Sequence, residues 1–157
     1  LTRTHQRRRE NVFVEFEFER GGVLRAEVSP HARETFACLS SQMPIDAKVF
    51  QARWSGREIF VPIRLPKKPP RERQTIRASL GDVIYFFEWA EQYEYTGFEA
   101  IGMFYGPEIV REWRGDAPVN VWARILPEYF PLLESIGERV WRQGGEGISV
   151  RIVPQGA

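Results

Sequence analysis

The sequence predicts a mainly β fold, a closed antiparallel barrel of about eight short strands capped by two helices. Strand-like apolar runs recur along the chain, two principal segments have helical spacing, and strands and helices do not alternate regularly. Closing the sheet into a barrel removes exposed strand edges. A chain of 157 residues fits one domain that buries about two-thirds of the surface of its unfolded state. We therefore expect a single barrel domain over residues 11–157.

The first predicted element is a hairpin. Apolar residues alternate with glutamates from Val14 to Phe18, and a second alternation covers residues 23–28 after Gly21-Gly22. Glycine adopts positive φ without steric cost, which a tight turn between antiparallel strands requires. Each strand is expected to bury one face.

A helix is predicted next. Ser29 offers a capping hydroxyl, and the fixed φ of Pro30 suits a first helical turn. Pro44 is expected to end this helix. Its apolar residues at helical spacing are Ala32, Phe36, Leu39 and Met43.

The middle of the chain is expected to form strands separated by a loop. Residues 47–54 and 58–63 predict a second hairpin, and the prolines within residues 64–74 predict an exposed basic loop. Two further strands are expected over residues 83–86 and 98–105.

The C-terminal third mixes both kinds of element. Pro107 and Gly115 frame a predicted short helix, because proline favours a first turn and glycine a helix end. A strand is expected over residues 119–124, the second principal helix over 129–140, and a closing strand over 148–153.

Composition argues against several classes of protein. No apolar stretch approaches the roughly 18 residues of a membrane span, and no signal-peptide pattern is visible. Cys38 is the one cysteine, so we expect no disulfide framework and a reducing, cytoplasmic setting. His5 and His31 lie in no metal-ligand spacing, and the glycine-rich run 144–147 lacks the lysine of a phosphate loop. We expect no metal and no cofactor.

The charge is uneven although the net charge is +1. Residues 1–10 hold four arginines against one glutamate and are expected to form a disordered basic arm. Residues 64–77 hold six cationic side chains against one carboxylate, so the rest of the chain is acidic. No aromatic residue interleaves with the arginines of the arm, and no DNA-binding module follows, so we expect no nucleic-acid partner.

Three segments together resemble the bacterial cyclophilin-like domains of uncharacterised function. Residues 23–39 are similar to the strand of that family and the proline-initiated helix that follows it, including Thr35-Phe36 and Leu39. Gly81-Asp82-Val83 resembles the entry to a central strand, and residues 120–125 resemble a late strand. The resemblance implies a cyclophilin-like barrel and carries no catalytic motif.

The isomerase site of catalytic cyclophilins is not matched. There a Phe-His-Arg run supplies an arginine that hydrogen-bonds the proline amide. This chain has Phe50-Gln51-Ala52-Arg53, in which the histidine is missing and the arginine is one residue further on. A slip of one residue turns a strand side chain to the other face. The Gln-Gly-Gly run is also replaced, by residues 57–62.

We expect the ligand site near the second hairpin and the 81–105 segment. Arginine beside aromatic faces binds planar or carboxylate groups, while the rings exclude water. The same residues also suit barrel packing and a cross-strand ion pair. The candidate ligand-binding residues are Arg53, Trp54, Arg57, Glu58, Tyr85, Glu88 and Tyr105.

Three hypotheses for function follow. The first is a domain that binds a small carboxylate- or amide-bearing ligand, with or without catalysis. The second is a peptide-binding module or a weak peptidyl-prolyl isomerase. The third is a non-catalytic subunit whose aromatic surface is buried in a homo-oligomer.

Overall fold

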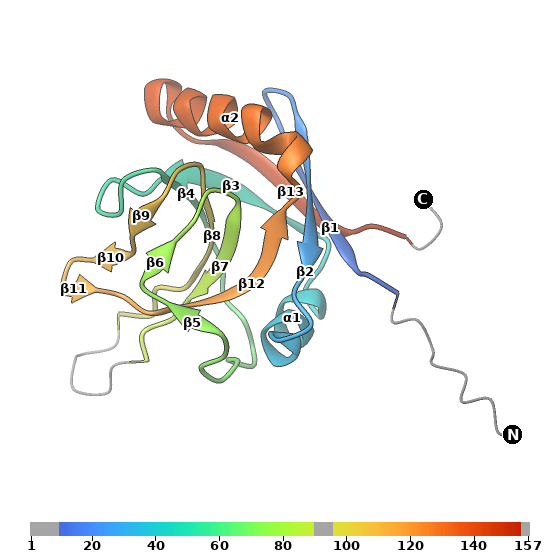
Figure 1. Cartoon of the computed structure of the whole chain (residues 1–157), viewed down its shortest axis with the longest axis vertical. Helices are drawn as coiled ribbons and strands as arrows, with labels where there is room; N and C mark the ends of the chain where they lie inside the picture. Colours follow the sequence, from blue (N-terminus) through green and yellow to red (C-terminus); the bar gives the residue numbers. More distant parts are fainter. Residues whose placement is uncertain (1–9, 90–95, 155–157) are drawn as a thin grey trace, which may run out of the picture.

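The computed structural model describes residues 10–89 and 96–154, so the expected basic arm lies almost entirely outside the described residues. The fold is a closed antiparallel barrel of eight strands (Figure 1). Pairing of residues 123–125 with residues 26–28 closes it. Around the barrel the strands are β2 (Val23–Val28), β1 (Phe13–Phe18), β13 (Glu146–Ile152), β3 (Ile45–Gln51), β4 (Glu58–Pro62), β8 (Ala100–Phe104), β7 (Asp82–Phe86) and β12 (Val119–Ile125). The predicted fold class is confirmed.

Both predicted hairpins are present. In the first, Phe16 pairs with Leu24 across β1 and β2, and both side chains are fully buried. In the second, Phe50 of β3 pairs with Phe60 of β4. The alternation in the sequence therefore corresponds to inward and outward faces.

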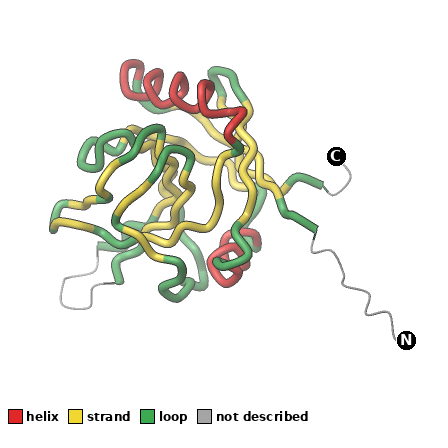
Figure 2. The backbone as a smooth tube through the Cα atoms, in the orientation of Figure 1, coloured by secondary structure: helices red, strands yellow, loops and turns green. Residues whose placement is uncertain are grey.

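Two principal helices lie at opposite ends of the barrel, with α2 at the top of the view and α1 at the bottom (Figures 1 and 2). They are α1 (Arg33–Ser40) and α2 (Phe130–Gln143), and a 3-10 turn, η1 (Pro127–Tyr129), leads into α2. Gly144 follows α2 with φ of 89°, as expected of a helix-ending glycine. No helix in the described ranges combines the length and apolar character needed to cross a membrane.

The N-terminus of α1 is capped from a distant segment. The helix begins at Arg33, after Ser29-Pro30, and its first turn has no side-chain cap from its own N-cap residue. The Glu72 carboxylate instead accepts hydrogen bonds from the backbone N–H of Thr35 at 2.9 Å and from the Thr35 hydroxyl at 2.8 Å. The basic loop is thereby attached to the helix, and a carboxylate lies at the positive end of the helix dipole.

The barrel interior is filled with apolar side chains. Trp122, Tyr85, Phe16, Leu24 and Met103 are almost completely buried and belong to one continuous cluster. Phe36 of α1 stacks on Trp122 with ring centroids 6.2 Å apart. This cluster accounts for the inward faces of the strands.

One side of the barrel is buried on its outer face as well. Every residue of β8 is buried, as are most of β7 and β12, so these strands carry apolar side chains inside and outside. A second cluster covers the outer face, and its members are Ala78, Ile84, Phe104, Val110, Ala117, Val119 and Val121. It packs beneath a flap of short strands beside β7 and β8 (Figure 1). The flap comprises β6 (Arg77–Ala78), β9 (Glu108–Ile109), β10 (Arg111–Glu112) and β11 (Gly115–Asp116), and β5 (Gln74–Thr75) extends the sheet at β12.

The predicted helix between Pro107 and Gly115 is wrong. The segment forms β9, β10 and β11, because its backbone finds partners elsewhere: the Val110 N–H donates to the Ile76 carbonyl at 2.8 Å. Val110 is buried, whereas Trp113 is 76% exposed, so the segment does not present the single apolar face of an amphipathic helix. The stabilisation gained by covering the apolar outer face of the barrel outweighs the local preference for a helix.

The cap from Glu72 yields a first prediction. Glu72→Ala should lower the free energy of unfolding by about 1 kcal/mol, because two backbone N–H groups of α1 lose a carboxylate acceptor. Urea denaturation measures this loss. The matched control is Glu134→Ala at an exposed position of α2, which should change stability much less. Equal losses in the two variants would contradict the capping role.

Candidate functional site

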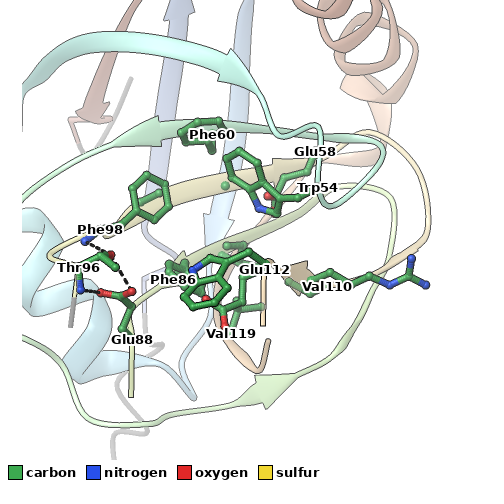
Figure 3. Close-up of a pocket in the computed structure, with 15 residues that line it drawn as sticks. Trp54, Glu58, Phe60, Phe86, Glu88, Thr96, Phe98, Val110, Glu112 and Val119 are labelled. Carbon is green, nitrogen blue, oxygen red and sulfur yellow. Dashed lines mark hydrogen bonds between the residues drawn. The ribbon is translucent and has the colours of Figure 1, made fainter. Parts of the chain in front are cut away.

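A pocket of about 230 Å³ lies between the outer face of the barrel and the flap. Its walls come from the turn before β4, from β4, β7 and β8, and from the flap strand β10 with its neighbours. Most lining side chains are apolar. The lining residues are Trp54, Glu58, Phe60, Ile84, Phe86, Glu88, Thr96, Phe98, Ala100, Gly102, Val110, Arg111, Glu112, Trp113 and Val119 (Figure 3).

Gly102 creates much of the space. It lies on β8 opposite Phe60 of β4 and Ile84 of β7, at an outward-facing position between Ile101 and Met103, whose side chains fill the barrel. A Cβ at this position would lie 2.9 Å from Ile84 Cδ1 and 3.1 Å from Glu58 Oε2. The pocket floor is therefore open because residue 102 has no side chain.

Aromatic rings form the walls. Trp54 and Phe60 have centroids 5.1 Å apart, Phe60 and Phe98 5.7 Å, and Phe98 and Phe86 also 5.7 Å. Figure 3 shows Trp54, Phe60 and Phe98 on the upper side of the pocket, with Phe86 and Val119 on the lower side. The tilted and edge-on ring contacts are favourable geometries for such clusters. They leave ring surface facing the cavity, to which a flat ligand can pack.

Glu58 contributes a buried carboxyl to this pocket. The residue is 5% exposed, and its Oε2 has no hydrogen-bond partner among the described residues. Burial in apolar surroundings raises the pKa of this carboxyl to about 8. At neutral pH Glu58 is therefore mostly an uncharged carboxylic acid, which both donates and accepts a hydrogen bond.

Glu88 lines the same pocket, but its carboxylate is already engaged. It accepts hydrogen bonds from the Thr96 hydroxyl at 2.7 Å, from the backbone N–H groups of Thr96 and Gly97, and from Arg114 Nη2 at 2.9 Å. Burial acts to raise the pKa of Glu88, but these hydrogen bonds outweigh it and the pKa is lowered. Arg114 also binds both carboxylate oxygens of Glu112 at 2.6 Å. This network fixes the flap to the segment before β8.

The structure separates the residues that the sequence grouped as one site. Trp54, Glu58 and Glu88 line the pocket, and Tyr85 does not. Tyr85 points into the barrel, where its hydroxyl donates to the buried carboxylate of Glu99. Tyr85 follows Ile84 on β7, so alternation along the strand directs the two side chains to opposite faces.

Arg53, Arg57 and Tyr105 lie in a different, shallow basin next to α2. Arg57 is ion-paired with Glu108 at 2.8 Å, and the Tyr105 hydroxyl donates to Gln51 Oε1 at 2.6 Å. The Tyr105 ring packs so closely on α2 that a Cβ at Gly137 would lie 2.3 Å from it. The two arginines that suggested a carboxylate ligand are therefore absent from the pocket lining.

The sequence grouping missed the glycine and several rings. Gly102 interrupts an otherwise continuous apolar strand, and a glycine inside a strand often marks close approach of a ligand or another chain segment. Phe60, Phe86 and Phe98 lie in the predicted strand-like runs around it. The strand register places Phe60 and Phe86 at outward positions, whereas Phe98 precedes β8. The same runs contain residues that fill the barrel. Composition alone therefore does not distinguish the residues that line the pocket from those that fill the barrel.

The described part of the chain contains no group of three or more His, Cys, Asp or Glu side chains placed to hold a metal ion. The ionisable side chains that line the pocket are Glu58, Glu88, Arg111 and Glu112.

Comparison with solved structures reveals similar folds at low sequence identity. The structure of McbB in complex with tryptophan matches with a TM-score of 0.67 and 16% identity, over 92% of this chain and 45% of McbB. The match thus spans less than half of McbB. A hypothetical protein from Archaeoglobus fulgidus matches with a TM-score of 0.57 and 20% identity, over 90% of this chain and 94% of that protein. A cyclophilin-type peptidyl-prolyl cis-trans isomerase from Cryptosporidium parvum matches with a TM-score of 0.49 and 11% identity, over 93% of this chain and 99% of the isomerase.

No curated protein matches the sequence significantly. The model of a family described as a protein of unknown function, DUF3830, matches residues 20–152. The match begins after β1 and covers every later described strand, including the whole of β13, and both principal helices. The expectation of a domain of uncharacterised function is thereby confirmed, and the chain belongs to the DUF3830 family.

Proposed function

We propose that this domain binds a small molecule with a flat apolar body and one polar head group, in the pocket between the barrel and the flap. The observation that carries the proposal is an apolar pocket whose buried carboxyl, Glu58, has no hydrogen-bond partner among the described residues. A buried polar group without a partner is costly, and a ligand that hydrogen-bonds to it removes that cost.

The size and the walls of the pocket support the proposed body of the ligand. An apolar cavity of roughly 150 Å³ is enough to hold benzene, and this pocket has about 230 Å³. One or two fused rings fit such a volume. The rings of Trp54, Phe60, Phe86 and Phe98 offer surfaces against which such a body packs.

The chemistry of Glu58 supports a head group that carries an N–H. A protonated carboxyl pairs with an amide in both directions, because its O–H donates to the amide carbonyl and its own carbonyl oxygen accepts from the amide N–H. An amine also donates N–H to the carboxyl. A carboxylate ligand is less well supported, since Arg53 and Arg57 lie outside the pocket.

McbB has been solved in complex with tryptophan, a molecule with a flat aromatic body, an amine and a carboxylate. The likeness between the two chains concerns the fold, so it does not identify a ligand for this one. It does make indole derivatives reasonable first probes of the pocket.

The proposal does not extend to prolyl isomerisation. That activity would need a guanidinium over the bound proline amide, and Arg53 lies in the basin beside α2. Among the described residues lining the pocket, the one arginine is Arg111, whose side chain is exposed.

Filling the pocket floor should weaken binding. Gly102→Ala places a methyl group against Ile84 and Glu58, and we expect affinity for a bound indole derivative to fall about tenfold or more, as for a steric change of one methyl group. The barrel should still fold, because the closest atom is the flexible end of Ile84. Calorimetric titration measures the affinity.

The control for this experiment is Arg53→Ala, which removes an exposed arginine of the site predicted from the sequence. It should bind as the wild type does. The site assignment is wrong if Arg53→Ala loses affinity while Gly102→Ala keeps it.

The protonation of Glu58 predicts a dependence of stability on pH. Its pKa is raised on folding from 4.5 to about 8, so in this range the folded state holds a proton that the unfolded chain has lost. The stability of the wild type should therefore fall relative to that of Glu58→Gln as the pH rises through this window, and level off above it. The shift in the pKa of Glu58 sets an upper bound of roughly 5 kcal/mol on this pH-dependent loss of stability.

Urea denaturation of both proteins between pH 5 and 9 measures this difference. The comparison cancels the titration of the other carboxylates, which are the same in the two proteins. A difference in stability that does not change with pH would show that Glu58 has an ordinary pKa in the folded state.

A further inference from the structure

The charges around the pocket restrict the head group of the ligand. Three carboxyl groups line it, those of Glu58, Glu88 and Glu112, against the exposed guanidinium of Arg111. They come from β4, from the segment after β7, and from the flap strand β10. Arg114, which is not one of the lining residues, forms ion pairs with both Glu88 and Glu112.

The two guanidinium groups therefore balance Glu88 and Glu112, and the pocket is close to neutral only while Glu58 keeps its proton. Ionised Glu58 would leave one negative charge in an apolar cavity, where an isolated charge is costly. None of the ion pairs between described residues involves Glu58. A positive charge that compensates ionised Glu58 has to come from the ligand.

The walls suit a cation as well as a flat body. Trp54, Phe60, Phe86, Phe98 and Trp113 surround the cavity, and the faces of such rings attract an organic cation while excluding water. Phe104, opposite Glu58 on β8, and Val110 of the flap contribute no charge. The recess at Gly102 lies beside Glu58, since a Cβ built there would be 3.1 Å from Oε2.

We infer that the ligand is an organic amine, which binds as an ammonium ion against Glu58 with its apolar body between the aromatic rings, and that Glu58 releases its proton to the solvent on binding. This inference rests on the proposed function and narrows the head group from any N–H donor to a cation. The balance of the step is simple. One ammonium ion enters, the O–H bond of the Glu58 carboxyl breaks, one proton leaves to the solvent, and a buried ion pair forms.

The test is calorimetric titration with two matched pairs of probes, tryptamine against indole-3-acetamide and 2-phenylethylamine against phenylacetamide. Each pair shares its ring system and differs in the head group. Titrations in buffers of different ionisation enthalpy give the number of protons released. With a Glu58 pKa of about 8, we expect ~0.9 protons to be released per amine bound at pH 7, and close to none at pH 9.

Affinity for the amines should rise about a hundredfold between pH 6 and pH 9, because at the higher pH Glu58 is already ionised and binding no longer has to displace its proton. Binding of the amides, where it occurs, should release no proton and should weaken above pH 8. Glu58→Gln should bind the amines more weakly at pH 9 and release no proton. Because glutamine keeps the shape of the side chain without its ionisation, this variant is expected to fold.

The results of these titrations distinguish failure of the amine inference from failure of the proposed function. If the amides bind at least as tightly as the amines, or the amines bind without proton release, the inference is wrong and the proposed pocket stands. If none of the four probes binds, or Gly102→Ala binds them as the wild type does, the inference and the proposed function both fail.

Discussion

The arrangement of this domain depends on strands that are apolar on both faces. In an ordinary barrel one face of each strand is exposed, but β8 is buried throughout and β7 nearly so. Apolar surface outside the barrel has to be covered, because each exposed Å² costs roughly 25 cal/mol. The flap of β6, β9, β10 and β11 provides the cover, and the Glu88–Arg114–Glu112 network holds it there. The pocket is the part of this second interface that side chains leave unfilled.

This origin explains the unusual properties of the site. A cavity that arises between two apolar layers has a low dielectric, so the proton of the carboxyl within it is retained well above the usual pH. Gly102 keeps the cavity open at the level of that carboxyl. The same features make the site dependent on the flap, since removal of the cover would hydrate Glu58 and return its pKa towards the ordinary value.

Much of the barrel follows from local patterns in the sequence. Alternation from Val14 to Phe18 and over residues 23–28 specifies a hairpin, because one face of each strand must be buried. The flap does not follow from its sequence, since Pro107 and Gly115 are also helix signals and its strands depend on partners distant in the chain. The candidate site was predictable in part. Trp54, Glu58 and Glu88 face the pocket, whereas Arg53 and Tyr85 are directed elsewhere by strand register and turn geometry that composition does not encode.

The proposed site depends on one property, a buried carboxyl that keeps its proton at neutral pH. Carbon-13 NMR of the Glu58 side-chain carboxyl, titrated from pH 4 to pH 10 in the unliganded protein and assigned with Glu58→Gln, measures it directly. The structure predicts a single titration step near pH 8. A step near pH 4.5, the usual value for glutamate, would show that the pocket is hydrated and would contradict the account.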